Sequence, residues 1–68
     1  MSQTTTYTVT GMTCGHCVSS VTEEVQEIPS VESVEVVLET GAVTIASAEP
    51  IDEATVRAAV EEAGYQLA

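Results

Sequence analysis

Residues 4–29 read TTTYTVTGMTCGHCVSSVTEEVQEIP, and this stretch decides the fold. Near its start, Tyr7 and Val9 are each flanked by threonine, a pattern typical of a half-buried β-strand. Valine or isoleucine then recurs at spacings of three, four and three up to Ile28, which predicts one apolar stripe of an amphipathic helix. Pro29 should end this helix at or just after Ile28. The stretch therefore predicts a strand, a loop that contains two cysteines, and a helix.

The middle of the chain predicts a β-hairpin. Val34, Val36 and Leu38 alternate with other residues and share one face of a second strand. A turn at residues 40–41 leads to a third strand over residues 42–46, in which larger apolar residues again alternate with small or polar ones.

The last part of the chain predicts a second helix and a short strand. Asp52 is a good N-cap, and Ile51 before it is placed to pack on Val56 as a hydrophobic staple. The apolar stripe of this helix ends before Gly64, whose position after the helix favours left-handed backbone. Residues 65–67 then form the final strand.

The predicted order is strand, helix, strand, strand, helix, strand. Each helix has one apolar stripe and the strands alternate, so both helices should cover one face of a four-stranded antiparallel sheet. The predicted fold class is α+β, a ferredoxin-like βαββαβ sandwich. The chain has 68 residues, so we expect a single domain over residues 1–68 with no room for a large active-site cleft.

The charge of the chain is strongly negative. Eleven acidic residues stand against one basic residue, Arg57, for a formal net charge of −10. This excludes nucleic-acid binding, which needs cationic side chains to neutralise phosphates, and adsorption to anionic lipid. It favours a partner with positive potential, although acidity that serves only solubility explains it equally well. No apolar run is long enough to insert in a membrane, and residues 1–6 lack signal-peptide features, so we expect a cytoplasmic protein.

Cys14-Gly15-His16-Cys17 carries the chemistry. Thiols stay reduced in the cytosol, and a disulfide between residues three positions apart would stabilise little. Two thiolates bound to one ion by bonds of about 2.3 Å each would hold it between sulfur atoms about 4.6 Å apart. Soft thiolates select Cu(I), for which two suffice, whereas a structural zinc site wants four ligands. The same pair also fits a redox dithiol, so both interpretations stay open.

Residues 11–17, GMTCGHC, resemble the GMTCxxC motif of the heavy-metal-associated domain family. The likeness extends to the helix exit at Ile28-Pro29, the strand over residues 31–38 and the closing residues 63–65. It points to the small bacterial cytosolic copper chaperones of the CopZ type. The resemblance implies Cu(I) bound by the two cysteines and handed to a copper-exporting P-type ATPase. One departure is Ser30, where the family commonly has glycine.

Several residues near the cysteines are candidate auxiliary residues. Met12 is a buried support of the loop in the family, or else a thioether ligand, and Gly15 frees the loop backbone to bend. His16 is a third ligand or points to solvent and tunes the thiolates by its charge. Thr13 stands where relatives that bind zinc or cadmium often have Asp, which tilts the choice of metal toward copper. Tyr65 either shields the metal site or fills an edge of the core.

Three other interpretations compete with the copper chaperone. The string CGHC also occurs in disulfide isomerases of the thioredoxin fold, so a thiol–disulfide oxidoreductase is the enzymatic alternative. A mercury- or zinc-binding domain on the same fold is the second, and a fragment of the ATPase is the third. Met1 and the ending at Leu67-Ala68 favour a free-standing protein. Two copies could also form a homodimer in which facing cysteine pairs share copper. The glutamates of the first helix form either a solvated face or a face that docks a partner.

Overall fold

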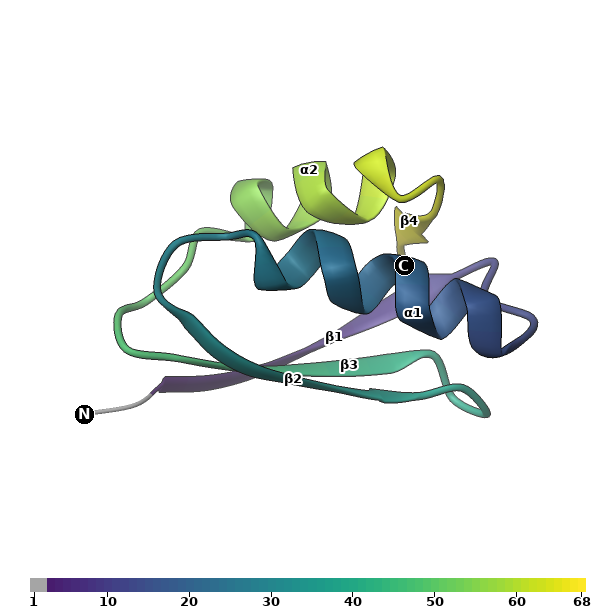
Figure 1. The fold of residues 1–68 in the computed structure, drawn as a ribbon, viewed down its shortest axis with the longest axis horizontal. Helices are drawn as coiled ribbons and strands as arrows, with labels where there is room; N and C mark the ends of the chain where they lie inside the picture. The colour runs from purple at the N-terminus through teal and green to yellow at the C-terminus, as the bar shows by residue number, and fades with distance from the viewer. Residues whose placement is uncertain (1–2) are drawn as a thin grey trace.

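Strands and helices follow one another in the predicted order (Figure 1). The computed structural model describes residues 3–68. Met1 and Ser2, with which the signal-peptide expectation begins, lie outside the described residues. The elements are β1 (Gln3–Thr10), α1 (Gly15–Gln26), β2 (Val31–Val37), β3 (Ala42–Ser47), α2 (Glu53–Glu62) and β4 (Gln66–Leu67).

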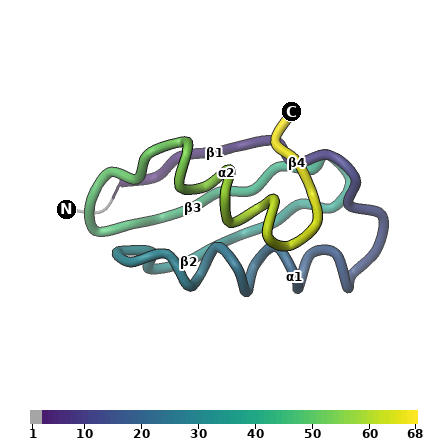
Figure 2. The backbone as a smooth tube through the Cα atoms, turned by 90° about the horizontal axis from the view of Figure 1, so that it is seen from above, coloured from purple at the N-terminus to yellow at the C-terminus, as the bar shows by residue number. Residues whose placement is uncertain are grey.

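The strands form one antiparallel sheet in the order β2-β3-β1-β4. Both helices lie on one face of this sheet, and seen from above they run beside one another (Figures 1 and 2). The predicted α+β, ferredoxin-like arrangement is therefore confirmed. Among the helices described in residues 3–68, none has the length and apolar character needed to cross a membrane.

The core fills the layer between the sheet and the helices. Its helical members lie on the stripes that the sequence predicts, and its strand members lie on one face of β1 and β3, because alternate side chains of a strand point to opposite faces. The buried cluster contains Val9, Val21, Val25, Val43, Ile45, Val56 and Val60. A core made almost wholly of valine follows from a composition without phenylalanine or tryptophan.

One expectation about the hairpin is wrong. Leu38 does not share the strand face of Val34 and Val36, because β2 ends at Val37 and Leu38 lies in the turn with 37% of its surface exposed. The turn closes where the backbone N–H of Gly41 donates to the carbonyl oxygen of Val37 at 2.9 Å. Alternation predicts a face correctly only as far as the strand continues.

The helix ends differ slightly from the predictions. α1 ends at Gln26, and Ile28 lies in the following turn, where it packs against the core. Asp52 is the N-cap residue of α2, as predicted, but its side chain makes no capping hydrogen bond. Its backbone carbonyl oxygen instead accepts a hydrogen bond from the backbone N–H of Thr55 at 3.0 Å. Gly64 follows α2 with a φ of 97°, as its predicted position requires.

Candidate metal site

The loop between β1 and α1 brings both cysteines to the start of a helix. Gly11 has a φ of 90°, which lets the chain turn away from β1. Cys14 is the N-cap residue of α1, and its carbonyl oxygen accepts hydrogen bonds from the backbone N–H groups of Cys17 (3.0 Å) and Val18 (3.4 Å). Cys14 therefore lies just outside the helix, and Cys17 lies in its first turn.

The two sulfur atoms lie 3.6 Å apart. A disulfide would require a bond of about 2.05 Å, so the pair is a reduced dithiol, and both cysteines are free. Cys14 is exposed, whereas only 8% of Cys17 is accessible. An incoming ligand can thus reach one sulfur directly while the other stays covered.

Hydrogen-bond donors surround the sulfur of Cys17. The backbone N–H of Thr13 donates to it at 3.5 Å, and the hydroxyl oxygen of Thr13 lies 3.9 Å away. The Tyr65 hydroxyl is a further donor. Led by the Thr13 N–H, these donors lower the pKa of Cys17 from 9.0 to about 6, against the opposing effect of burial. The thiolate, which is the form that binds metal, is therefore the main form of Cys17 at neutral pH.

Tyr65 connects the end of the chain to this loop. It is half-buried and packs against the core, as one of its two predicted roles requires, and its hydroxyl interacts with the Cys17 sulfur; shielding of a metal stays a prediction. The pKa of Tyr65 is raised, because its hydroxyl must keep its proton to donate to the thiolate. A Cβ atom at Gly11 would meet the Tyr65 ring at 3.5 Å, which is an ordinary contact distance.

The other auxiliary candidates surround the pair without joining it. Met12 is half-buried and packs against the core. His16 is exposed, and a Cβ atom at Gly15 would have no neighbour within 4 Å. Within residues 3–68, no three His, Cys, Asp or Glu side chains gather closely enough to hold one metal ion together. The site therefore offers two sulfur donors, which suits a soft ion of low coordination number better than zinc.

Comparison with known proteins decides the family. The model of the heavy-metal-associated domain matches residues 6–66. The chain belongs to the heavy-metal-associated domain family. Copper chaperone CopZ of Bacillus subtilis (strain 168) is 38% identical to this heavy-metal-associated domain over 64 residues, which cover 93% of each chain. A solved CopZ metallochaperone matches its structure with a TM-score of 0.90 at 31% identity, covering 97% of this chain and 100% of the other.

A transporter contains a similar segment. Copper-transporting ATPase 1 of Rhizobium meliloti (strain 1021) is 37% identical to this heavy-metal-associated domain over 59 residues, which are 87% of the domain but only 7% of the ATPase. The predicted family and the predicted fold are confirmed. The sequence named Tyr65 as a candidate beside the cysteine loop, but it did not predict that the Tyr65 hydroxyl lowers the pKa of Cys17, because this depends on how the end of the chain packs against the loop.

Proposed function

We propose that this chain is a single-domain carrier of Cu(I) in the cytoplasm. Cys14 and Cys17 bind the ion, and the carrier passes it to a copper-transporting P-type ATPase. The observation that carries the proposal is the reduced sulfur pair, 3.6 Å apart at the start of α1, with one sulfur exposed. Its support is membership of a family in which a copper chaperone is similar over nearly the whole chain.

Transfer would proceed by exchange of thiolate ligands. A thiolate of the acceptor approaches from the side of Cys14, where the site is open, and joins the ion as a third ligand. One of the two original thiolates then leaves, and the ion moves across one bond at a time. This sequence needs neither a general base nor an oxyanion hole, so the chain acts as a carrier and not as an enzyme. Cytoplasmic thiols stay reduced, as the mechanism requires.

The proposed acceptor is a domain of the same family within the ATPase. A segment of a copper-transporting ATPase resembles this chain at 37% identity, so donor and acceptor would have similar folds. Similar sites on both sides would make the transfer nearly balanced in free energy. The direction of transport would then depend on the ATPase, which removes the ion from the acceptor.

A second function, thiol–disulfide exchange, is favoured by one observation. The lowered pKa of Cys17 is also what a reactive dithiol needs. The fold is not that of thioredoxin, and the part of the chain from residue 3 onward has no cis peptide bond of the kind found beside the dithiol of that fold. Reduction of insulin by the protein, at a rate well above that of a free dithiol, would favour this alternative.

A competition titration against a strong Cu(I) chelator tests the carrier. Wild type should bind one Cu(I) per chain. Zinc-binding peptides gain about 10–16 kcal/mol from four ligands, so the loss of one thiolate should cost roughly two to three orders of magnitude in affinity. We expect this loss in Cys14→Ser and in Cys17→Ser, because no third donor stands ready to replace either sulfur among the described residues. Ser19→Ala, an exposed change in α1, is the matched control. Equal binding by all four proteins would refute the proposal.

A further inference from the structure

The outer edge of β1 is open along most of its length. On one side β1 pairs with β3 over residues 3–8. On the other side β4 pairs only with Val9 and Thr10, and the last contact is the backbone N–H of Ala68, which donates to the carbonyl oxygen of Thr8 at 2.8 Å. Residues 3–7 therefore have no neighbouring strand on this side within the described part of the chain.

The backbone groups on this open side can be assigned from the pairing. Backbone groups of successive strand residues point alternately to the two neighbours. The N–H of Val9 points toward β3, where it donates to the carbonyl oxygen of Gly41 at 2.8 Å, whereas Thr8 points toward β4. By the same alternation, the N–H and C=O groups of Thr4 and Thr6 point to the open side. They are available to pair with another strand.

The two edges of the sheet differ in their protection against such pairing. The opposite edge, β2, carries Glu32 and Glu35 and has an irregular register between Val31 and Ser33. Charges and irregularities are how natural sheets prevent unwanted strand addition. Residues 3–7, QTTTY, contain no charge and no proline, and their register with β3 is regular. The β1 edge lacks the features that protect the β2 edge.

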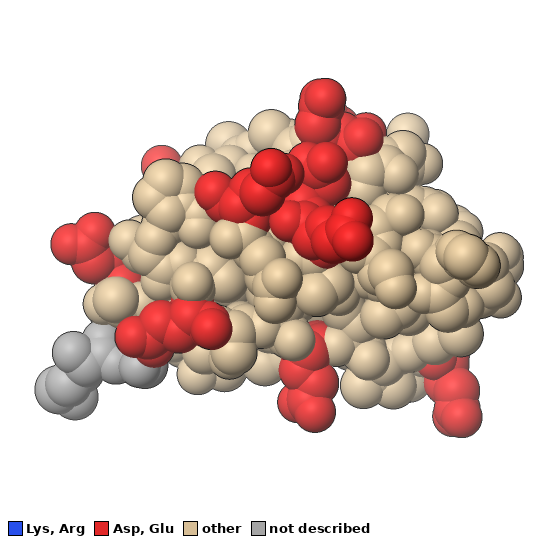
Figure 3. All heavy atoms as spheres, viewed as in Figure 1, with Lys and Arg blue, Asp and Glu red and all other residues tan. Residues whose placement is uncertain are grey.

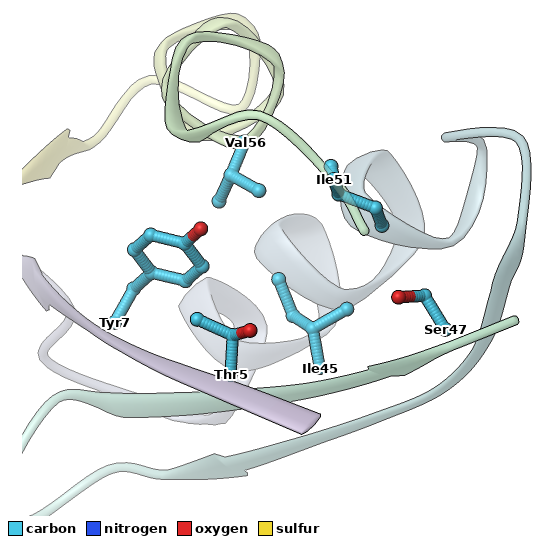
Figure 4. Close-up of a pocket in the computed structure, with 6 residues that line it drawn as sticks. All are labelled: Thr5, Tyr7, Ile45, Ser47, Ile51 and Val56. Atoms are coloured by element: carbon cyan, nitrogen blue, oxygen red, sulfur yellow. The ribbon is translucent and has the colours of Figure 1, made fainter. Parts of the chain in front are cut away.

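A small cavity lies directly inside this unprotected edge (Figure 4). It has a volume of about 10 Å³, enough for a water molecule or a methyl group. Figure 4 shows Thr5 and Tyr7 pointing from β1 toward Val56 of α2, with Ile51 on the side of the cavity that Ile45 and Ser47 of β3 also line. A strand added in line with β4 would place alternate side chains on this side of the sheet. One small apolar side chain could then fill the cavity.

We propose that the open edge of β1 binds an extended segment of another protein as an added strand. Main-chain hydrogen bonds supply affinity in this type of recognition, and a pocket for an alternate side chain supplies specificity. The connector before α2 carries exposed carboxylates at Glu49 and Asp52, whereas that of Glu53 in α2 is paired with Arg57 at 2.7 Å. The segment should therefore be cationic as well as apolar at one position. A second copy of the chain fits poorly, because each copy has a net charge of −10.

This site is separate from the copper site. The Gln3 end of β1 and the loop that holds the cysteines lie at opposite ends of the molecule (Figure 1). Strand addition requires no metal, so it neither supports nor depends on the copper proposal.

Titration of the reduced, metal-free protein with a synthetic peptide tests the proposal. The probe is a blocked peptide of alternating threonine and valine with lysine at both ends, and binding is followed by amide chemical shifts. We expect saturable shifts at Thr4, Thr6 and Val56. Thr6→Pro removes one N–H from the open side and no backbone bond to β3, and should weaken binding about tenfold, the effect of one lost hydrogen bond. It also loses the contact between the hydroxyls of Thr6 and Thr44 (3.1 Å), which Thr6→Val loses as well. Thr6→Val keeps the N–H and should bind like wild type.

Two further experiments, which change the peptide and not the protein, test the proposal even if Thr6→Pro fails to fold. A peptide N-methylated at the residues that face β1 should bind about tenfold more weakly than one methylated at the residues that face away. A peptide with glutamate in place of lysine should also bind more weakly, and added salt should reduce the difference. Equal binding of the N-methylated pair, shifts confined to β2, or a peptide-free dimer in sedimentation would each overturn the proposal. Affinity for Cu(I) should be the same with and without the peptide.

Discussion

Loading with Cu(I) should move the sulfur of Cys14 outward. The two sulfur atoms now lie 3.6 Å apart, whereas two bonds of about 2.3 Å in a straight line separate them by about 4.6 Å. If the pair kept its spacing, the angle at the ion would be only about 103°. The missing distance of about 1 Å should come from Cys14. Cys17 is covered and held by Thr13 and Tyr65, whereas Cys14 is exposed and lies outside the helix.

X-ray absorption at the copper edge and NMR of the same sample can test this movement. Absorption should show two sulfur neighbours and no nitrogen or oxygen neighbour. The chemical shifts of residues 12–15 should change strongly, and those of Tyr65 and the rest of α1 should change little. A third scattering neighbour would mean that the pair stays bent and leaves room for another ligand. Large chemical-shift changes at Tyr65, together with unchanged chemical shifts at Cys14, would mean that the sulfur of Cys17 moves instead, and would refute the reasoning.

Four further predictions concern the Cys17 thiolate and two glycines. Tyr65→Phe removes a donor, so the pKa of Cys17 should rise from about 6, and an unchanged ultraviolet thiolate titration would contradict the hydrogen bond. Folding lowers the pKa of Cys17 from 9.0 to about 6, so the free energy of unfolding should increase as the pH rises from about 6 to 9. Denaturation measured across this pH range should show the increase in wild type and not in Cys17→Ser. Gly64→Ala should cost about 1–2 kcal/mol for its positive φ alone. Gly41→Ala should lower the melting temperature further than Gly64→Ala, because its Cβ would collide with the backbone carbonyl oxygen of Val9, whereas a Cβ at Gly64 would meet nothing; equal losses would refute this.

The fold was predictable because apolar residues recur with the helical period in both helices and with the strand period in the strands, and all these patterns bury the same side of each element. The spacing of apolar residues in both helices and the alternation in β1 and β3 agree with the same buried layer. The errors lie at the ends of secondary-structure elements. Leu38 continues the alternation of β2 by one step too many, and Asp52 holds the N-cap position without using its side chain. Neither departure has a local sequence signal, since each depends on how the neighbouring turn closes.

The candidate site was predictable as a pair of residues but not as an electrostatic environment. The spacing of Cys14 and Cys17 predicts their proximity, because residues three apart lie close together at the start of a helix. The low pKa of Cys17 depends on the loop conformation, which aims the Thr13 N–H at its sulfur, and on a hydroxyl from the other end of the chain. Ser30 shows the reverse case: its φ of 79° is one that glycine adopts more readily than serine, which agrees with the glycine expected at this position from the family resemblance.

The distribution of carboxylates bears on which ion the sulfur pair would select. All eleven acidic residues occur at or after Glu23, so the strand and loop that carry the cysteines contain no carboxylate. Figure 3 shows acidic side chains gathered over the upper middle of the molecule, with few at the end where the loop lies. Oxygen donors are what harder ions require, and a four-coordinate ion at the pair would lack them. The net charge of −10 therefore attracts cations and basic partners to the molecule in general, while the sulfur pair itself would discriminate by softness.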